Sequence, residues 1–389
     1  MAKYQILTLN NIAVAALDRF PRGRYEVASE LQHPDAVLVR SHRMHDWPVP
    51  ASLKAVARAG VGVDNIPIDA LSARGIPVFN APGANANAVK ELVLAGMLLA
   101  ARHITEGWLY ARAVSGADEE ISRQVEAEKK RFRGIELRGR TLGVVGLGAI
   151  GVQVANAAHG LGMRVVGFDP NITVSNAWRL SAQTEHARSV GDLLQQADFV
   201  TLHVPLGEST RHLINAQRLQ CVHPGATLLN FAREGIVDEE AVSDALREQR
   251  LGAYVCDFPT NLLQSHPGVV CLPHLGASTV ESEENSAVAA VERLRSFLED
   301  GTVSHSINFP DMDMPRSGGH RLLVVNANVP HMIERISKAI AAQDINIIDL
   351  LNRSRGDLAC TLVDIECPVP EAVLKDIRQV EGVLAVHAL

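Results

Sequence analysis

Cysteine is scarce in this chain, and the spacing of the cysteines excludes two common designs of small domains. The chain has five, an odd number with no C-x-x-C pair: Cys221, Cys256, Cys271, Cys360 and Cys367. A disulfide framework needs paired cysteines, and zinc sites use closely spaced ones, so neither is predicted. We expect buried, reduced thiols and no metal site.

Long apolar runs and an excess of positive charge are also lacking. The longest apolar segment, 92–101, is much shorter than a membrane span, and the first residues lack the apolar core of a signal peptide. We therefore expect a cytoplasmic protein without a membrane partner. The net charge of −7 argues against a broad basic face for nucleic acid. The 389 residues suffice for about two to three globular domains.

Short apolar strands alternate with helical stretches in the first part of the chain. The predicted strands are 4–9, 36–39, 55–57 and 78–79. This rhythm indicates a small parallel α/β domain. Apolar residues at helical spacing over 88–112 predict one long helix packed between domains or subunits, and the charged stretch 118–133 predicts a solvated helix.

The same rhythm resumes after residue 141 with six more strands. They are predicted at 142–145, 164–168, 199–203, 227–230, 252–256 and 269–272. Six is the number of a full dinucleotide-binding sheet. A helix over 280–298 and a loop over 301–319 follow, and residues 321–389 show the β-α-β-β-α-β order of a ferredoxin-like domain. This last part has no cofactor motif, so we expect it to bind an effector or to regulate.

A glycine-rich motif follows the first strand of the second series. Gly146, Gly148 and Gly151 form G-x-G-x-x-G between an apolar strand and a helix. In this motif the first glycine makes a tight turn, the second lets the backbone approach a pyrophosphate, and the third lets helix pack on strand. Asp169, 18 residues after Gly151, stands where a carboxylate holds the ribose hydroxyls and repels a 2′-phosphate. The motif therefore predicts NAD as cofactor.

An arginine and a histidine follow later strands of the same predicted sheet. Arg233 comes just beyond strand 227–230, and His274 lies in the loop after strand 269–272. A guanidinium grips a carboxylate in a planar fork, and an imidazole titrates near neutral pH as a general acid–base must. Alone, each is more often a surface ion pair or a satisfied polar residue. Their shared place at the carboxyl edge of one sheet favours a hydride-transfer site.

Five motifs stand in a fixed order along almost the whole chain. They are Gly60-Val-Gly-Val-Asp-Asn-Ile66, Gly146-Leu-Gly-Ala-Ile-Gly151, His203-Val-Pro-Leu206, Asn230-Phe-Ala-Arg233 and Pro273-His-Leu-Gly-Ala-Ser-Thr279. In this order they resemble the D-2-hydroxyacid dehydrogenases, most closely the D-3-phosphoglycerate dehydrogenase family with a C-terminal ACT domain. The resemblance implies a Rossmann-type doubly wound parallel sheet, a discontinuous flavodoxin-like α/β substrate domain and a ferredoxin-like α+β ACT domain.

The resemblance also implies domain limits. It gives 1–95 with 280–310 to the substrate-binding domain, 96–279 to the NAD-binding domain, 311–320 to a linker and 321–389 to the ACT regulatory domain. Substrate would lie in the cleft between the first two domains.

Roles for individual residues come from the same resemblance. Arg233 would bind the substrate carboxylate and polarise the C2 oxygen, and His274 would exchange the proton with that oxygen. The implied cofactor contacts are Gly146, Gly148, Ala149, Ile150, Gly151, Asp169, His203, Val204, Pro205, Phe231, Ala232, Arg233, Asp257, His274 and Gly276. The implied substrate contacts are Arg40, Ser41, Val61, Gly62 and Asn85. Arg58 and Lys90 would add charge, although exposed cations often only solvate a surface.

The glutamate that pairs with the catalytic histidine in this family is missing. Asn261 stands in its place. An asparagine can orient an imidazole by hydrogen bonding, but it cannot stabilise the imidazolium as a charged partner does. Asp257, four residues earlier, is implied to contact the nicotinamide amide. A shifted loop that brings another acid to His274 remains an open alternative.

Three asparagines of the last domain fall where serine-binding ACT domains contact their ligand. They are Asn326, Asn328 and Asn346, so L-serine is the expected effector. The Pro-Gly of such domains is Pro330-His331 here, and a histidine side chain can block the close approach that glycine permits. The alternative is that the asparagines form turns and the domain only builds an oligomer interface. We expect a homodimer or homotetramer.

The resemblance implies NAD-dependent oxidation of D-3-phosphoglycerate to 3-phosphohydroxypyruvate, the first step of L-serine biosynthesis. A hydroxypyruvate or glyoxylate reductase of the same family is the nearest alternative, because only the phosphate pocket differs. A non-catalytic NAD-sensing interaction protein is the alternative from another class. The missing glutamate favours it, and the joint presence of Arg233 and His274 opposes it.

Overall fold

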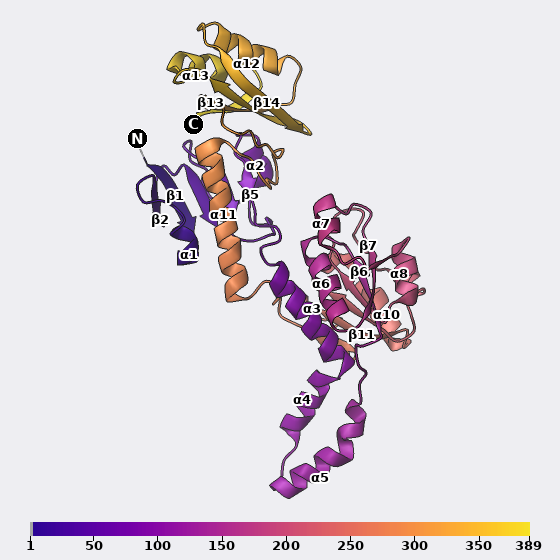
Figure 1. Ribbon diagram of the computed structural model, residues 1–389. Coiled ribbons are helices and arrows are strands. Elements are labelled where there is room, and N and C mark those ends of the chain that lie inside the picture. The colour runs from indigo at the N-terminus through magenta and orange to yellow at the C-terminus, as the bar shows by residue number, and fades with distance from the viewer. Residues whose placement is uncertain (1–2) are drawn as a thin grey trace. The chain divides into compact units, whose positions relative to one another are not determined.

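The computed structural model describes residues 3–389 and divides the chain into two compact units (Figure 1). One unit combines the chain up to Asn85 with Val280–Leu389, and the other is Ala86–Thr279. The predicted fold class is confirmed, with two parallel sheets and a separate antiparallel sheet. The finer domain limits given above stay a prediction.

The first unit begins with a five-stranded parallel sheet. Its elements are β1 (Tyr4–Leu9), α1 (Val14–Leu17), β2 (Tyr25–Ala28), β3 (Ala36–Val39), β4 (Ala55–Arg58), α2 (Ile68–Ser72), β5 (Val78–Phe79) and α11 (Val280–Asp300). The strand order β2-β1-β3-β4-β5 is the flavodoxin-like order. Helix α11 packs on β3, β4 and β5, because Ala287, Val291 and Leu294 lie on one helical face. The sequence missed the edge strand β2.

The second unit is built on a seven-stranded parallel sheet. Its strands are β6 (Thr141–Val145), β7 (Arg164–Phe168), β8 (Glu185–His186), β9 (Phe199–Leu202), β10 (Ala226–Asn230), β11 (Leu251–Cys256) and β12 (Val269–Cys271). The order β12-β11-β10-β9-β6-β7-β8 is that of a dinucleotide-binding sheet with one further strand. The prediction of six strands was wrong by one, because β8 consists of two exposed polar residues and has no apolar signal.

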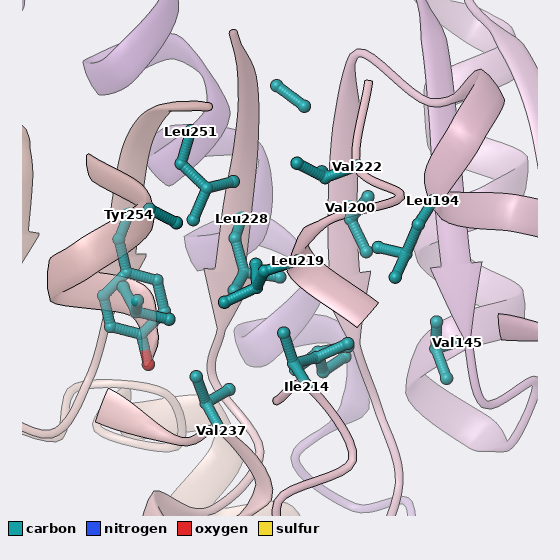
Figure 2. Packing of buried hydrophobic residues seen from close by; sticks show 14 of the residues in the cluster. Val145, Leu194, Val200, Ile214, Leu219, Val222, Leu228, Val237, Leu251 and Tyr254 are labelled. Atoms are coloured by element: carbon teal, nitrogen blue, oxygen red, sulfur yellow. The ribbon is translucent and has the colours of Figure 1, made fainter. Parts of the chain in front are cut away.

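The second unit also contains helices, most of which cover the two faces of this sheet. They are α3 (Ala86–Ala101), α4 (Ile104–Ala113), α5 (Asp118–Glu128), the 3-10 turn η1 (Lys129–Phe132), α6 (Ala149–Gly160), α7 (Val174–Arg179), α8 (Val190–Gln196), α9 (Ala216–Leu219), η2 (Glu234–Ile236) and α10 (Glu239–Arg247). Figure 2 shows one face, where Val145, Val200 and Leu228 of neighbouring strands belong to one core and Leu194 of α8 lies beside Val200. The residues next to these along each strand point to the opposite face, toward α3 and α6, as expected for a parallel sheet that is buried on both sides.

The single long helix predicted over 88–112 is wrong. It divides at His103, whose φ of 48° lies in the left-handed region, so α3 ends and α4 starts in a new direction. Helix α3 packs on α6 and on β10, β11 and β12 of its own unit through Val93 and Met97. Helices α4 and α5 bury no residue and extend from the sheet as an arm (Figure 1).

The end of the chain forms the antiparallel sheet of the first unit. Its elements are β13 (His320–Ala327), α12 (Met332–Ala341), β14 (Ile347–Arg355), β15 (Leu358–Ile365), α13 (Glu371–Arg378) and β16 (Val383–Ala388), with the ferredoxin-like order β14-β15-β13-β16. Leu322 and Val324 face α12 and α13, whereas Leu323 and Val325 share a core with Phe297 of α11. This C-terminal domain is therefore docked on the first sheet's own helix.

Candidate active site

Five parallel strands of the second unit end side by side. The register pairs Val145 with Leu202, Leu202 with Asn230, Asn230 with Cys256, and Cys256 with Cys271, each at or next to a strand end. The segments after these strands carry the glycine-rich motif, His203, Arg233, Asp257 and His274. The fold thus brings the candidate residues of this unit to one carboxyl edge, where open α/β sheets bind ligands.

The three motif glycines each meet a different steric demand. Gly146 has φ of 92°, and a Cβ there would lie 2.5 Å from the carbonyl oxygen of His203. A Cβ on Gly151 would lie 1.9 Å from the carbonyl oxygen of Gly146, so helix and strand pack only with glycine. Around Gly148, which caps α6, nothing lies within 4 Å of the Cβ position. This open space at a helix N-terminus fits a pyrophosphate.

Asp169 holds the same turn from the end of β7. Its Oδ2 accepts a hydrogen bond from the backbone N–H of Leu147 at 2.8 Å, and its Oδ1 accepts one from Asn171 at 2.8 Å. Each carboxylate oxygen keeps a further lone pair for a hydroxyl donor. The residues present therefore fit NAD, with the carboxylate fixed beside the glycine-rich turn.

His203 presents an unsatisfied nitrogen at the end of β9. Its Nε2 lies 3.0 Å from Oγ1 of Thr201, whereas Nδ1 is buried and has no hydrogen-bond partner among the described residues. Burial lowers the pKa of this imidazole to about 3, so it is neutral at physiological pH. A buried polar atom without a partner is costly, and a bound cofactor group would satisfy it.

Arg233 is held by the side chain of Asn230. The Asn230 Nδ2 donates to the carbonyl of Arg233 at 2.9 Å, and its Oδ1 accepts from the N–H of Ala232 at 3.1 Å. The guanidinium donates to the Ala232 carbonyl at 2.7 Å and forms no ion pair in the described part of the chain. A half-buried cation without an anionic partner is suited to a substrate carboxylate.

Asp257 organises the loop that carries His274. Its buried carboxylate accepts hydrogen bonds from the N–H groups of Leu275 at 2.8 Å and Gly276 at 2.7 Å, and its backbone carbonyl accepts one from His274 at 3.1 Å. His274 itself has φ of 56° and an exposed ring, 5.2 Å from the ring centroid of Phe258. The sequence missed this positioning role, and the implied contact of Asp257 with the nicotinamide stays a prediction.

Asn261 is exposed, and its side chain is engaged elsewhere. Its Oδ1 accepts a hydrogen bond from Nε2 of Gln264 at 3.3 Å. Within residues 3–389, no hydrogen bond joins it to His274, and no carboxylate forms an ion pair with His274. The structure thus leaves the ring nitrogens of His274 free for a substrate.

The substrate residues predicted in the first unit gather after β3 and β4. Arg40 forms a two-pronged ion pair with Glu283 of α11, and its carbonyl accepts a hydrogen bond from Nε of Arg58 at 2.9 Å. Asn80 donates to the carbonyl of Val61 at 2.6 Å, next to Gly62. Ser41 donates its N–H to Asn10 at 3.0 Å. The guanidinium of Arg40 therefore already has an anionic partner in Glu283.

Of two further predicted residues, Asn85 directly precedes α3 and Lys90 lies in its second turn. The Oδ1 of Asn85 is buried without a partner in the described chain, which leaves an acceptor for a ligand. Lys90 lies 3.5 Å from the carboxylate of Glu91, so its charge is partly neutralised.

The three asparagines of the C-terminal domain do not meet within one chain. The register places Asn326 beside Ala359, at the end of the sheet where Asn328 donates to Gly356 at 2.9 Å. Asn346 precedes β14 at the opposite end, where Ile347 pairs with Ile365. An effector that contacts all three would need residues from two chains.

Three expectations about thiols, metal sites and membrane spans can be compared with the structure. Cys256 and Cys360 are buried, but Cys221 is exposed, which corrects the expectation that all thiols are buried. Among residues 3–389, no group of three or more potential ligands could hold a metal ion, and no helix is long and apolar enough to cross a membrane.

Known proteins are similar to this chain in sequence and in fold. The profile of the D-isomer specific 2-hydroxyacid dehydrogenase NAD binding domain matches residues 95–276. The D-3-phosphoglycerate dehydrogenase of Methanocaldococcus jannaschii is 33% identical over 349 residues, 87% of this chain and 63% of that protein. The chain thus spans less than two thirds of that relative. The Escherichia coli K12 D-3-phosphoglycerate dehydrogenase is 31% identical over 350 residues, 87% of this chain and 82% of that protein.

Solved structures give the same picture. The NAD⁺-bound 3-phosphoglycerate dehydrogenase of Entamoeba histolytica is similar with a TM-score of 0.61 and 25% identity, and the match covers 79% of this chain and 99% of that chain.

Proposed function

The chain belongs to the D-3-phosphoglycerate dehydrogenases of the D-isomer-specific 2-hydroxyacid dehydrogenase family, and we propose that it oxidises D-3-phosphoglycerate to 3-phosphohydroxypyruvate with NAD, the first step of L-serine biosynthesis. The observation that carries this proposal is the placement of Arg233 and His274 at the edge that also holds the glycine-rich turn. The M. jannaschii and E. coli relatives bear the same activity in their names.

The chain's own residues divide the chemistry between them. Arg233 binds the substrate carboxylate and polarises the C2 oxygen. A ring nitrogen of His274 takes the hydroxyl proton, while Asp257 holds the loop on which the ring stands. When bound, NAD supplies the acceptor for the hydride that leaves C2. The C2 hydroxyl thereby loses one proton and C2 one hydride, which leaves the ketone.

Cofactor contacts follow from the same edge. Gly148 and the helix N-terminus take the pyrophosphate, and Asp169 takes the ribose hydroxyls. The free Nδ1 of His203 and the segments after β9 and β10 line the remainder. In this proposal Arg40 and Ser41 bind the substrate phosphate, and Val61, Gly62 and Asn85 make further contacts with the substrate.

The proposal also includes the oligomeric state, the effector and the cellular location of the protein. Trp108 and Leu109 on α4 are 56% and 61% exposed, which supports a homodimer or homotetramer that covers this arm. We keep L-serine as the effector of an ACT-type C-terminal domain, supported by the buried, unpartnered Oδ1 of Asn326. A cytoplasmic location is supported by five cysteines that form no disulfide.

Substitution of Arg233 tests the proposal. Arg233→Ala removes a charged partner of the substrate carboxylate, an interaction of about 2–5 kcal/mol, so kcat/KM for D-3-phosphoglycerate should fall about 30-fold to several thousand-fold. The dissociation constant of NADH, measured by fluorescence titration, should change little. Arg247→Ala, on the exposed face of α10, is the matched control and should keep both values. Equal loss of turnover and NADH binding in Arg233→Ala would contradict the assigned role.

A further inference from the structure

A cavity lies where the C-terminal domain docks on the first sheet of its own unit. Its volume is about 180 Å³, several times the roughly 30 Å³ that one water occupies in the liquid. Its walls include Tyr4, Lys54, Phe297, Leu323, Arg378 and His387. We call it the docking cavity, because its lining comes from both partners of the dock.

Two cations border the docking cavity from opposite sides. Lys54 directly precedes β4 of the first sheet, and its Nζ lies 2.8 Å from Oδ1 of Asp35. Arg378 ends α13 of the C-terminal domain, and its Nη1 donates to Glu371 at 2.9 Å. The other nitrogens of this guanidinium have no hydrogen bond to the described chain. Asp35 and Glu371 offset part of the positive charge of Lys54 and Arg378. We therefore expect a modest affinity for an anion.

His387 adds an unsatisfied polar atom to the same wall. It stands on β16, its ring packs edge-on against Phe297 with 6.3 Å between centroids, and its Nε2 is buried without a hydrogen-bond partner. Burial, with the positive charges of Lys54 and Arg378, lowers the pKa of this imidazole to about 4, against a smaller opposing effect of Asp35. The ring is therefore neutral at pH 7 and can donate from Nε2 in one tautomer.

We propose that the docking cavity binds a small oxyanion, a carboxylate or phosphate group, which Lys54, Arg378 and His387 hold across the joint between the C-terminal domain and the first sheet. Such an anion receives charge-assisted hydrogen bonds from both sides and satisfies the buried nitrogen. Because it contacts both partners only when they are docked, it stabilises the docked arrangement. The site is separate from the three asparagines and from the proposed active site, so it does not depend on either assignment.

The charged and polar lining of the docking cavity favours a bound ligand over an empty packing gap. A cavity lined only by apolar side chains stays dry, and one with two cations and an unmet imidazole nitrogen does not. Water alone can occupy it, but a cavity that only holds water gives no saturable response to an added anion. A saturable response to an anion, weakened by changes to Lys54 or Arg378, therefore separates the proposal from a hydrated packing gap and from anion binding at the active site.

Calorimetric titration of the full chain, saturated with NADH to fill the nucleotide site, tests the proposal. The two probes are inorganic phosphate and malonate, each at millimolar concentrations. We expect saturable binding of at least one probe to the unaltered chain and at least tenfold weaker binding to Arg378→Gln and Lys54→Gln. Lys375→Gln removes a charge from the same helix without lining the cavity, so it should bind as the unaltered chain does.

Every outcome of this titration either supports or overturns the proposed anion site. If the variants at Lys54 and Arg378 lose binding of phosphate alone, the ligand bears a phosphate; loss of malonate binding alone assigns a carboxylate, and loss of both assigns a site for either oxyanion. Absence of saturable binding, or equal binding in all variants, would overturn the proposal.

A second measurement avoids dependence on how the variants fold. In histidine-labelled protein, the ring signal of His387, assigned by its loss in His387→Gln, should move when the bound probe is added. The pKa of His387 should then rise, because an anion favours the imidazolium. If neither the ring signal nor the pKa of His387 changes when either probe is added, this result would also contradict the proposed site.

Discussion

Asp257 shows how one buried carboxylate holds a loop of the candidate site in place. Its two oxygens accept the backbone N–H groups of Leu275 and Gly276, and its carbonyl accepts that of His274. These three bonds hold a loop in which His274 adopts φ of 56°. Asp257 is therefore a positioning residue for the imidazole.

Asp257→Asn tests this role. An amide has one acceptor oxygen, and its NH2 group would face one of the two backbone donors, so about 1.5–3 kcal/mol of hydrogen bonding is lost. We expect kcat to fall about 10- to 100-fold while KM changes less than about threefold, since the carboxylate-binding Arg233 stays in place. Steady-state kinetics measures kcat and KM separately, and Asp244→Asn on the exposed face of α10 is the matched control.

A fall in kcat that follows a lower melting temperature, with no loss at temperatures where the variant is fully folded, would assign Asp257 to stability alone.

Sequence reasoning placed Asp257 and His274 in the site, but it did not predict the hydrogen bonds from the loop of His274 to this carboxylate. The positive φ of His274 and the path of residues 273–276 depend on the packing of β11 and β12, and no local pattern encodes them. The same limit applies to Asn261. An alignment by spacing puts it opposite the histidine, whereas the folded loop turns its amide toward Gln264.

At the scale of elements, the glycine-rich turn and α6 form the most predictable part of the molecule. A tight turn, a close approach and a helix–strand contact each require glycine, and the distances at Gly146 and Gly151 agree. The break at His103 and the short strand β8 were missed for opposite reasons. Apolar residues continue across the break, and β8 has none.

Gly148→Ala separates space for the cofactor from stability of the turn. The backbone at Gly148 has φ of −76°, and nothing lies within 4 Å of the added methyl group, so the melting temperature should not fall. The methyl group would occupy the space predicted for the pyrophosphate, and the dissociation constant of NADH should rise by about tenfold or more, roughly 1.4 kcal/mol.

Gly160→Ala, near the end of the same helix and also with an open Cβ position, is the control for this comparison. NADH affinity that is equal in the two variants would place the pyrophosphate elsewhere.

At the scale of the whole molecule, a buried arginine fixes the C-terminal domain to its unit. Arg321 and Asp364 are 0% and 1% exposed and form a bidentate pair at 2.6 and 2.8 Å. The guanidinium also donates to the carbonyls of Asp300, at the end of α11, and Pro315 in the connecting segment. Sequence patterning predicted this domain and its order of elements, but not its docked face, because Leu323 and Leu322 look alike until their partners are known.

Arg321→Met tests how strongly this pair holds the dock. It leaves Asp364 buried without its partner, which destabilises a protein by about 3–5 kcal/mol. Thermal unfolding should show a lower midpoint, or a separate early transition of the C-terminal domain. Arg335→Met, on the exposed side of α12, should leave unfolding unchanged. Unaltered unfolding of Arg321→Met would show that the apolar contacts alone fix the domain.

The central claim is that Arg233 and His274 make this chain a dehydrogenase. It is tested most directly by following NADH formation with D-3-phosphoglycerate, D-glycerate and a panel of other 2-hydroxy acids. We predict turnover that is fastest with D-3-phosphoglycerate and falls about 10²- to 10⁴-fold in His274→Ala, because the proton acceptor is lost. Absence of substrate-dependent NADH formation by the unaltered chain would contradict the account and favour a non-catalytic NAD-binding protein.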